Sequence, residues 1–352
     1  MVKRLNGGII MRYMGSETYC RDIETAIRQT MDFHKYYGKK VLITGASGLI
    51  GSFITECFLY ANENFDARII VYAAGRSKDR LGIRFGKGYR ERKGSFQFIE
   101  SDITVLDIRQ DFDYIIHAAG YGHPEAFRKM PAEVLISHVV GTQKILETAR
   151  FNPNCRVLYI SSGEVQEQVE HLTFRACYPV GKKAAETLCI SYSEEYKTDV
   201  VIVRPGHTFG PNVTMHDNRA ATQFILSAAK GVDIKMYSTG EQIRTFSYVA
   251  DCVSGILTAL TRGAGKKVYG VSSGEKCSVR EFAEKCAAAG KCRVEMCIPD
   301  NVKKLETSPI KDQIISNDAL RELGWQAAYP LDDGIRNSIQ IIKMIEDKEK
   351  IS

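Results

Sequence analysis

The sequence lacks any apolar run long enough to cross a membrane. A transmembrane helix needs about 20 consecutive apolar residues, and no stretch of the 352 residues approaches that length. The start of the chain is also too weakly apolar for a secretory signal, since Ile9-Ile10-Met11 is its only apolar group. We therefore expect a cytoplasmic protein that has no membrane partner.

The sequence also lacks paired cysteines and any large excess of one charge. Its ten cysteines are scattered singly, with no Cys-x-x-Cys pair and no cluster of histidines, a pattern that predicts free thiols and no metal site. The net charge is only +6, and basic and acidic residues are interleaved except between Arg76 and Lys93. That basic stretch is either a solvated loop or an anion contact, and we expect no nucleic-acid partner.

What the sequence does have is a regular alternation of short apolar runs with segments of helical periodicity. The expected strands are residues 41–43, 68–72, 96–99, 114–117, 157–160 and 200–203. Two long helices are expected at residues 132–150 and 178–196. This alternation predicts an α/β fold with a Rossmann-like, doubly wound parallel sheet and helices on both faces.

The alternation starts late in the chain and ends early, which suggests three parts. Residues 1–38 are expected to form an N-terminal helical extension, with a docked helix from residue 17 to about 37. Residues 39–205 are expected to form the dinucleotide-binding domain. Residues 206–352, where turns and short elements replace the alternation, are expected to form a smaller C-terminal substrate-binding lobe interwoven with that domain and ending in a helix at 332–348.

A glycine-rich turn follows the first expected strand. Gly45, Gly48 and Gly51 are spaced to allow a tight turn, close approach of the backbone to a pyrophosphate, and close packing of the next helix on the strand. The N-terminus of that helix supplies free N–H groups and the positive end of its dipole. The predicted cofactor contacts in this turn are Gly45, Ser47, Gly48, Leu49, Ile50 and Gly51.

Tyr178 and Lys182 lie one helical turn apart, so their side chains share a face of the expected helix 178–196. A phenol with a pKa near 10 is a poor base, but a nearby ammonium and the positive charge of a nicotinamide favour the phenolate. Ser162 ends the preceding strand, where its hydroxyl can hold a substrate oxygen beside Tyr178. The order of glycine turn, serine, tyrosine and lysine predicts a nicotinamide-dependent enzyme.

These features resemble the extended short-chain dehydrogenase/reductase family of nucleotide-sugar epimerases, dehydratases and decarboxylases. Four further segments carry the resemblance: residues 117–120 (HAAG), Gly141-Thr142, residues 204–211 (RPGHTFGP) and residues 240–251 (GEQIRTFSYVAD). The resemblance implies an NAD(P) cofactor, bound also by Asp102, Ile103, Ala118, Ala119, Gly120, Tyr178 and Lys182. It further implies a nucleotide-sugar substrate, with Arg244 on the diphosphate and His207 at a position where the family often has asparagine.

Within the family, the chain is most similar to the UDP-glucuronate decarboxylases. Residues 215–225 (MHDNRAATQFI), 175–178 (RACY) and 161–165 (SSGEV) match segments of that group. The likeness implies that Glu164 acts near C5 of the sugar, that Arg219 binds the substrate and that the substrate is a UDP-sugar. Gly163 replaces the first of two carboxylates found in 4,6-dehydratases, which makes full dehydration a poorer match.

The choice between NAD and NADP stays open at this stage. NAD enzymes of this fold usually place an acidic residue after the second strand, whereas this chain reads Ala73-Ala74-Gly75-Arg76. Arg76 favours the 2′-phosphate of NADP, and Ser77 or Lys78 could take the same role. The decarboxylase likeness favours NAD instead.

We expect oxidation of the sugar C4 hydroxyl by Tyr178, Ser162 and Lys182, followed by chemistry at C5 assisted by Glu164. The alternatives are an NADPH-dependent 4-keto-sugar reductase and a non-catalytic nucleotide-sensing regulator. We also expect a homodimer in which helices 132–150 and 178–196 pack against their copies. Val139, Val140, Ile145 and Leu146 could serve that interface or could all face the sheet.

Overall fold

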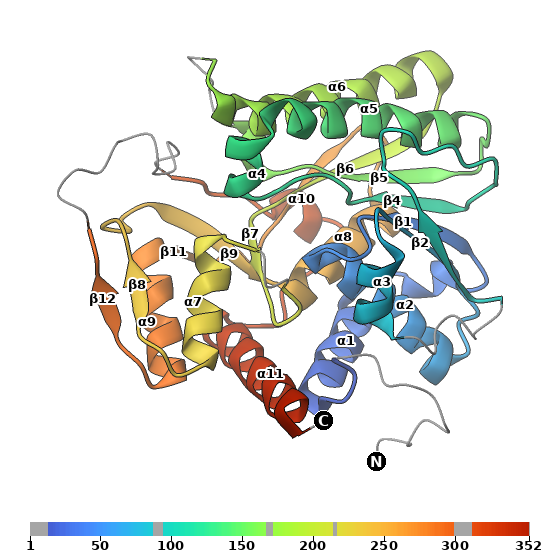
Figure 1. Ribbon diagram of the computed structural model, residues 1–352. Coiled ribbons are helices and arrows are strands. Elements are labelled where there is room, and N and C mark those ends of the chain that lie inside the picture. Colours follow the sequence, from blue (N-terminus) through green and yellow to red (C-terminus); the bar gives the residue numbers. More distant parts are fainter. Residues whose placement is uncertain (1–12, 87–93, 167–171, 214–216, 299–311, 352) are drawn as a thin grey trace.

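The core of the protein is a seven-stranded parallel sheet with the strand order β10-β6-β5-β4-β1-β2-β3 (Figure 1). The computed structural model describes residues 13–86, 94–166, 172–213, 217–298 and 312–351. In chain order the strands are β1 (Lys40–Thr44), β2 (Ile70–Gly75), β3 (Phe96–Glu100), β4 (Tyr114–His117), β5 (Arg156–Ile160), β6 (Asp199–Pro205) and β10 (Val268–Val271). The predicted doubly wound parallel sheet is confirmed.

Two details of the sheet differ from the prediction. β2 begins at Ile70 rather than Arg68, because Arg68 has a φ of 54° and cannot continue an extended strand. The sheet also gains β10, which pairs with β6 although it follows the predicted boundary at residue 205 by more than 60 residues. The division of the chain at 205 and 206 remains a prediction, and β10 shows that the later segment contributes to the central sheet.

Helices cover both faces of the sheet. On one face, α5 (Pro131–Arg150) and α6 (Cys177–Tyr196) bury residues such as Ile145 and Cys189 against β4, β5 and β6. On the other face, α2 (Leu49–Phe65) and α8 (Val249–Arg262) pack against β1 and β6 in the larger hydrophobic cluster. Alternate residues of each strand therefore enter two separate cores, as expected for strands buried on both faces.

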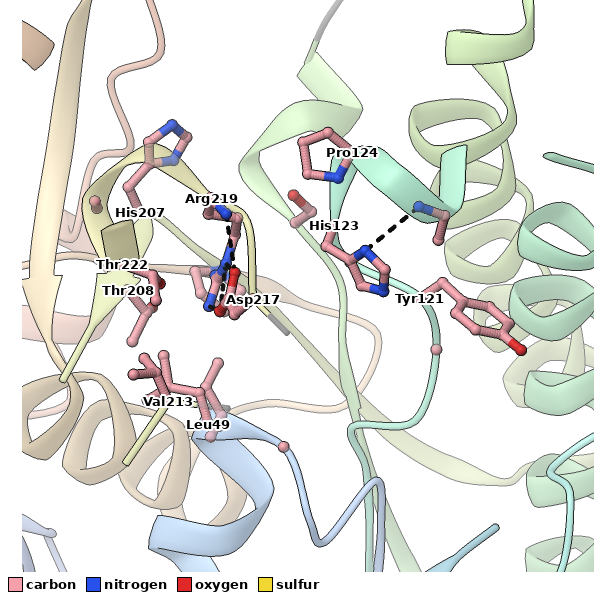
Figure 2. Close-up of a pocket in the computed structure, with 18 of the residues that line it drawn as sticks. Leu49, Tyr121, His123, Pro124, His207, Thr208, Val213, Asp217, Arg219 and Thr222 are labelled. Atoms are coloured by element: carbon pink, nitrogen blue, oxygen red, sulfur yellow. Dashed lines mark hydrogen bonds and ion pairs between the residues drawn. The ribbon is translucent and has the colours of Figure 1, made fainter. Parts of the chain in front are cut away.

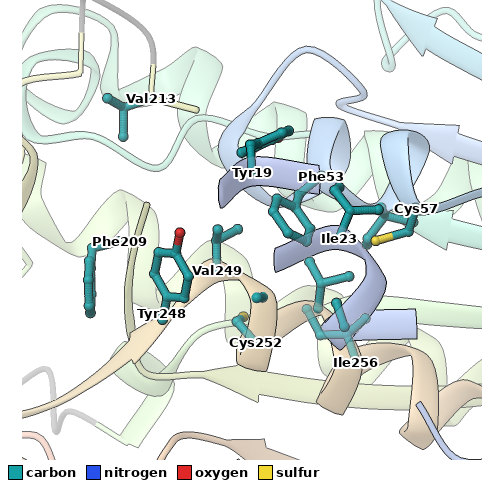
Figure 3. Packing of buried hydrophobic residues seen from close by; sticks show 14 of the residues in the cluster. Tyr19, Ile23, Phe53, Cys57, Phe209, Val213, Tyr248, Val249, Cys252 and Ile256 are labelled. Atoms are coloured by element: carbon teal, nitrogen blue, oxygen red, sulfur yellow. The ribbon is translucent and has the colours of Figure 1, made fainter. Parts of the chain in front are cut away.

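The N-terminal extension forms α1 (Glu17–Gln29) and the short 3-10 helix η1 (Phe33–Tyr36), rather than one helix to residue 37. The Thr30 hydroxyl donates to the Ala26 carbonyl at 2.8 Å, and Asp32 then adopts a φ of 58° that ends the helical path. Figure 3 shows α1 packing Tyr19 and Ile23 against Phe53 and Cys57 of α2. The extension is thus part of the main core.

The remaining elements form a second group beside the sheet, at the left of Figure 1. It contains a three-stranded sheet with the order β11-β9-β7 and a two-stranded sheet of β8 and β12. Its elements are β7 (His207–Phe209), α7 (Ala220–Ala229), β8 (Ile234–Met236), β9 (Ile243–Tyr248), β11 (Lys276–Ser278), α9 (Val279–Gly290), β12 (Val294–Met296) and α11 (Leu331–Ile351). Connecting helices are α3 (Lys78–Phe85), α4 (Pro124–Lys129), η3 (Gly163–Gln166), η4 (Phe174–Ala176) and α10 (Asp318–Arg321).

Some predicted features fall outside the described residues. They are residues 1–12 of the extension, residues 87–93 of the basic stretch, residues 167–171 after the SSGEV segment, and residues 215 and 216 of the MHDNRAATQFI segment. Among the helices that the structure does describe, none has both the length and the apolar character needed to span a bilayer.

Candidate active site

A large cleft of about 2110 Å³ lies at the carboxyl ends of the central strands, between the sheet and the second group of elements. Figure 2 shows His207 and Arg219 on one wall, Tyr121 and His123 on the opposite wall, and Leu49 near the base. A smaller adjoining pocket of about 180 Å³ shares the glycine turn with it. Ligand sites of open α/β sheets lie in this position, where strand ends and helix N-termini meet.

The glycine turn between β1 and α2 lines the cleft and packs closely against neighbouring backbone. Gly45 has a φ of 67°, and a Cβ there would lie 2.7 Å from the Ala118 carbonyl oxygen. A Cβ at Gly51 would lie 2.4 Å from the Gly45 carbonyl oxygen. Side chains are therefore excluded at both positions, which lets β1, the turn and α2 pack closely while the N-terminus of α2 lines the cleft.

The other predicted cofactor residues lie around the same turn. Asp102, Ile103 and Ala119 line the smaller pocket, while Ala118 and Gly120 line both. The Asp102 carboxylate accepts hydrogen bonds from the backbone N–H (2.9 Å) and hydroxyl (2.7 Å) of Thr104, which hold it in place. Ser47, Gly48, Leu49 and Ile50 also line the large cleft.

Arg76 follows β2 and lines both pockets. Its guanidinium hydrogen-bonds the Tyr121 hydroxyl and lies 4.6 Å from the centre of that ring. Ser77 also lines the large cleft, but its side chain caps α3 by accepting from the Arg80 N–H. Lys78 instead pairs with Glu100 at 3.5 Å and lines neither pocket, so it is the weakest of the three residues proposed for a 2′-phosphate.

Tyr178, Lys182 and Ser162 all line the same cleft. The Tyr178 ring stacks on Phe127 with ring centres 4.7 Å apart, and its hydroxyl hydrogen-bonds Ser162. Lys182 is buried on the same face of α6, where its Nζ donates to the Ile160 carbonyl at 2.7 Å. The end of β5 therefore orients both the serine and the lysine.

Tyr178 and Lys182 both have shifted pKa values in the protein without ligands. The predicted joint effect of the Lys182 ammonium and a nicotinamide on Tyr178 concerns the cofactor-bound protein and stays a prediction. Burial, reinforced by the negative charge of Glu164, raises the pKa of Tyr178 to about 12, and the hydrogen bond with Ser162 only partly opposes this. Burial also lowers the pKa of Lys182 to about 7. Both shifts have the same origin, because a low-dielectric site disfavours a phenolate and an ammonium alike.

Glu164 lies beside this centre in η3. Its backbone N–H donates to the Ser162 hydroxyl at 3.1 Å, and its carboxylate forms a 2.5 Å ion pair with Arg175. Arg175 also lies over the Phe127 ring at 4.8 Å, and its Nη1 is buried without a hydrogen-bond partner among the described residues. The pair thus offers a carboxylate and a spare guanidinium N–H at one place.

The predicted substrate residues line the wall formed by the second group of elements. His207 is neutral, because burial and the nearby Arg244 and Arg219 lower its pKa to about 3. Arg219 is held in a 2.6 Å ion pair with Asp217. The Arg244 side chain is buried, and its Nη1 donates to the Ile243 carbonyl at 2.9 Å.

Sequence reasoning missed several residues that line the cleft. Tyr121 and His123 directly follow the HAAG segment, so their position after a strand end was a usable signal. Arg175 lay within the RACY match but was given no role. Tyr13, which also lines the cleft, carried no signal because it lies in the extension before the first strand. Within the described ranges, no group of three His, Cys, Asp or Glu side chains is placed to hold a metal ion.

Two curated relatives are similar to most of this chain. UDP-glucuronic acid decarboxylase 1 of Danio rerio is 26% identical over 317 residues, which cover 86% of this chain and 72% of that protein. UDP-glucuronic acid decarboxylase 6 of Arabidopsis thaliana is 27% identical over 316 residues, which cover 84% of this chain and 86% of that protein.

Solved structures of low sequence identity share the fold. The dTDP-glucose 4,6-dehydratase of Bacillus anthracis, in complex with NAD, has a TM-score of 0.71 at 17% identity, covering 88% of this chain and 98% of that one. The UDP-glucuronic acid 4-epimerase of Bacillus cereus, in complex with UDP-glucuronic acid and NAD, has a TM-score of 0.70 at 22% identity. The match covers 87% of this chain and 99% of that one. The profile of the NAD dependent epimerase/dehydratase family matches residues 41–272. The chain therefore belongs to the NAD dependent epimerase/dehydratase family.

Proposed function

We propose that this chain oxidises the C4 hydroxyl of a nucleotide-linked sugar with bound NAD(P) and then acts at C5, as a UDP-glucuronate decarboxylase does. The observation that carries the proposal is the grouping of Ser162, Tyr178 and Lys182 with the Glu164–Arg175 pair in one cleft. The similarity to UDP-glucuronic acid decarboxylases supports it. A UDP-sugar is the favoured substrate, and His207, Arg219 and Arg244 are the proposed contacts on the substrate side.

The chain's own residues provide the proton transfer at C4. The Tyr178 oxygen accepts the proton of the C4 hydroxyl, and the Ser162 hydroxyl holds that oxygen in place. A bound oxidised nicotinamide would supply a hydride acceptor for C4 and, before the transfer, a positive charge beside Tyr178. That charge would lower the pKa of Tyr178 from about 12.

The Glu164–Arg175 pair suits a reaction at C5. A ketone at C4 makes a carboxylate on C5 a β-keto acid, which loses carbon dioxide and leaves an enolate at C4 and C5. We propose that Glu164 assists delivery of the proton that C5 must gain after carbon dioxide leaves, and that the spare N–H of Arg175 binds an anionic group on the sugar. Return of the hydride to C4 then makes the whole reaction redox-neutral.

A second candidate is an NADPH-dependent 4-keto-sugar reductase. The position of Arg76 directly after β2 favours this candidate. The residues before Arg76 include no acidic side chain that would repel a 2′-phosphate. The two candidates differ in cofactor use, because a reductase consumes NADPH stoichiometrically whereas the proposed reaction regenerates the bound cofactor.

The proposal is tested by supplying purified protein with UDP-, dTDP-, CDP- and GDP-sugars and identifying products by mass spectrometry. We expect UDP-glucuronate to lose carbon dioxide without net consumption of NAD(P). Tyr178→Phe should reduce turnover by at least about 1,000-fold, because the proton-accepting oxygen is lost. Binding of cofactor and UDP-sugar, measured by calorimetry, should stay within about twofold of wild type.

Several outcomes would overturn the proposal. Turnover by Tyr178→Phe at the wild-type rate would remove the proposed base. Stoichiometric NADPH consumption with a keto-sugar would favour the reductase. Tight nucleotide binding without any turnover across the panel would favour a non-catalytic sensor.

A further inference from the structure

A buried cluster connects the N-terminal extension to the glycine-turn helix. We call it the Arg84 cluster and define it as Tyr13, Tyr19, Ser52, Glu56 and Arg84. Tyr13 and Tyr19 belong to the extension, Ser52 and Glu56 to α2, and Arg84 to α3. The extension precedes the family match at residue 41.

Arg84 is the centre of this cluster. Its Nη2 donates to the Ser52 hydroxyl at 2.5 Å, and its Nε lies 4.0 Å from the Glu56 carboxylate. Its guanidinium lies over the Tyr13 ring, 4.5 Å from the ring centre. Arg84 is only 7% exposed and Glu56 is fully buried, so the two side chains stabilise each other's charge. The face of the Tyr13 ring stabilises the guanidinium further.

The extension closes the cluster from the opposite side. Tyr13 and Tyr19 have ring centres 5.2 Å apart, and the Tyr19 hydroxyl hydrogen-bonds the Glu56 carboxylate. The Tyr19 ring also packs edge-on against Phe53 at 5.5 Å, as Figure 3 shows. Tyr19 therefore contacts α2 directly, while Tyr13 packs against Tyr19 and lies under the guanidinium of Arg84 in α3.

The cluster adjoins the part of α2 that is proposed to bind the cofactor phosphates. Ser52 is one residue beyond Gly51, and its hydroxyl also accepts from Asn212 Nδ2 at 2.9 Å. Asn212 Nδ2 donates to the Leu49 carbonyl as well, at 2.7 Å, in the first turn of α2. Both Tyr13 and Arg84 line the cleft itself, together with Ser47, Leu49 and Ile50.

We propose that the N-terminal extension is a working part of the dinucleotide site, in which Tyr13 holds the Arg84 guanidinium against the first turn of α2. Arg84 fixes that turn through Ser52 and adds positive charge on the side where a pyrophosphate binds. Tyr13 and Arg84 are thus positioning residues for the cofactor. This inference rests on the dinucleotide site of the proposed function, but not on the sugar chemistry.

The test is calorimetric titration of full-length variants with NAD and, separately, with UDP. Arg84→Met should weaken NAD binding by about tenfold or more, because a charge beside the phosphate site is lost. Tyr13→Leu should weaken it by roughly three- to tenfold, since leucine fills space without attracting the guanidinium. Arg84→Lys, which keeps the charge, should recover part of the loss. UDP affinity should stay unchanged, because its proposed contacts lie on the wall formed by the second group of elements and outside the Arg84 cluster.

Tyr36→Phe is the matched control for structural damage. Tyr36 lies in the same extension, is fully buried and donates to the Leu257 carbonyl at 2.8 Å, outside the cluster. The Tyr36→Phe substitution should lower the midpoint temperature of thermal unfolding without changing NAD affinity. The inference would be overturned if both Tyr13→Leu and Arg84→Met bound NAD with wild-type affinity. It would also be overturned if these variants lost NAD and UDP affinity equally, in proportion to their loss of thermal stability.

The two proposals fail in different ways. A wild-type protein that binds NAD but converts no sugar would contradict the proposed reaction and leave the role of the Arg84 cluster standing. A wild-type protein that binds no dinucleotide would overturn both.

Discussion

Tyr178 and Lys182 have pKa values that burial moves in opposite directions, to about 12 and about 7. In the protein without ligands the tyrosine is therefore protonated, and the lysine titrates near neutral pH. A cationic nicotinamide close to the phenol would favour its deprotonated form. The base is thus proposed to become effective only when the cofactor is bound.

At the residue scale, Arg76 tests the cofactor preference. Its guanidinium can form charge-assisted hydrogen bonds with a 2′-phosphate, which NAD lacks. We expect calorimetry to show tighter binding of NADP than of NAD, and Arg76→Ala to weaken NADP binding by about tenfold while changing NAD binding little.

Lys78→Ala is the control for this prediction. Lys78 has the same charge two residues away but pairs with Glu100 and lines neither pocket. The Lys78→Ala variant should bind NAD and NADP with unchanged affinity. Tenfold tighter binding of NAD by the wild-type protein would reverse the assignment and would support the redox-neutral decarboxylase cycle.

At the scale of elements, α5 and α6 test the predicted homodimer. Two of the four positions considered for the interface, Ile145 and Leu146, are buried against the sheet and are unavailable. Val139 and Val140 are only half-buried, and Ile136 and Val180 are 49% and 38% exposed. An apolar strip therefore remains on the outer side of both helices, as an isologous interface requires.

Ile136→Glu should convert the dimer to a monomer at micromolar concentration, because the symmetry places two added charges in one interface. Sedimentation velocity measures the change. Val232→Glu provides the control, since Val232 is 55% exposed but lies beyond α7, on the other group of elements. A monomeric wild-type protein, or a dimer unaffected by Ile136→Glu, would refute this interface.

At the scale of the whole molecule, two buried carboxylates lie where the extension meets the later part of the chain. Asp22 of α1 accepts hydrogen bonds from Tyr248 (2.5 Å) and Asn337 (3.0 Å). Asp251 of α8 accepts from the backbone N–H groups of Ala328 (2.7 Å) and Tyr329 (3.0 Å). Burial raises the pKa of Asp22 to about 6 and that of Asp251 to about 7.

These shifts predict a fall in stability between about pH 4 and pH 7. Over that range the folded protein keeps protons on Asp22 and Asp251 that the unfolded chain has released, so raising the pH favours unfolding. Asp22→Asn should reduce this fall by on the order of 2 kcal/mol in the free energy of unfolding. Urea denaturation at several pH values measures the free energy of unfolding of both proteins and therefore this difference.

Asp32→Asn should have the opposite effect on the pH dependence. Hydrogen bonds from Arg262 and Lys35 lower the pKa of Asp32, so its contribution to the free energy of unfolding is present at neutral pH and is lost on acidification.

For the Asp22 prediction, equal dependence of stability on pH in wild type and Asp22→Asn would show that the Asp22 carboxyl titrates normally.

The sequence by itself determined the parallel sheet, the glycine turn, and the shared helix face of Tyr178 and Lys182. Each depends on short-range geometry: the period of apolar residues, the steric demands at Gly45 and Gly51, and a four-residue spacing. Even Glu164 and Arg219 could be selected from local matches to related segments.

Only the tertiary structure decided how the surroundings act on those residues. The pKa of Tyr178 depends on burial, on Glu164 and on Ser162, and neither the pairing of Arg175 with Glu164 nor that of Tyr13 with Arg84 follows from spacing along the chain. The addition of β10 to the sheet is equally non-local. Local periodicity is set by backbone sterics, whereas contacts between distant segments and the desolvation of charges exist only after the chain has packed.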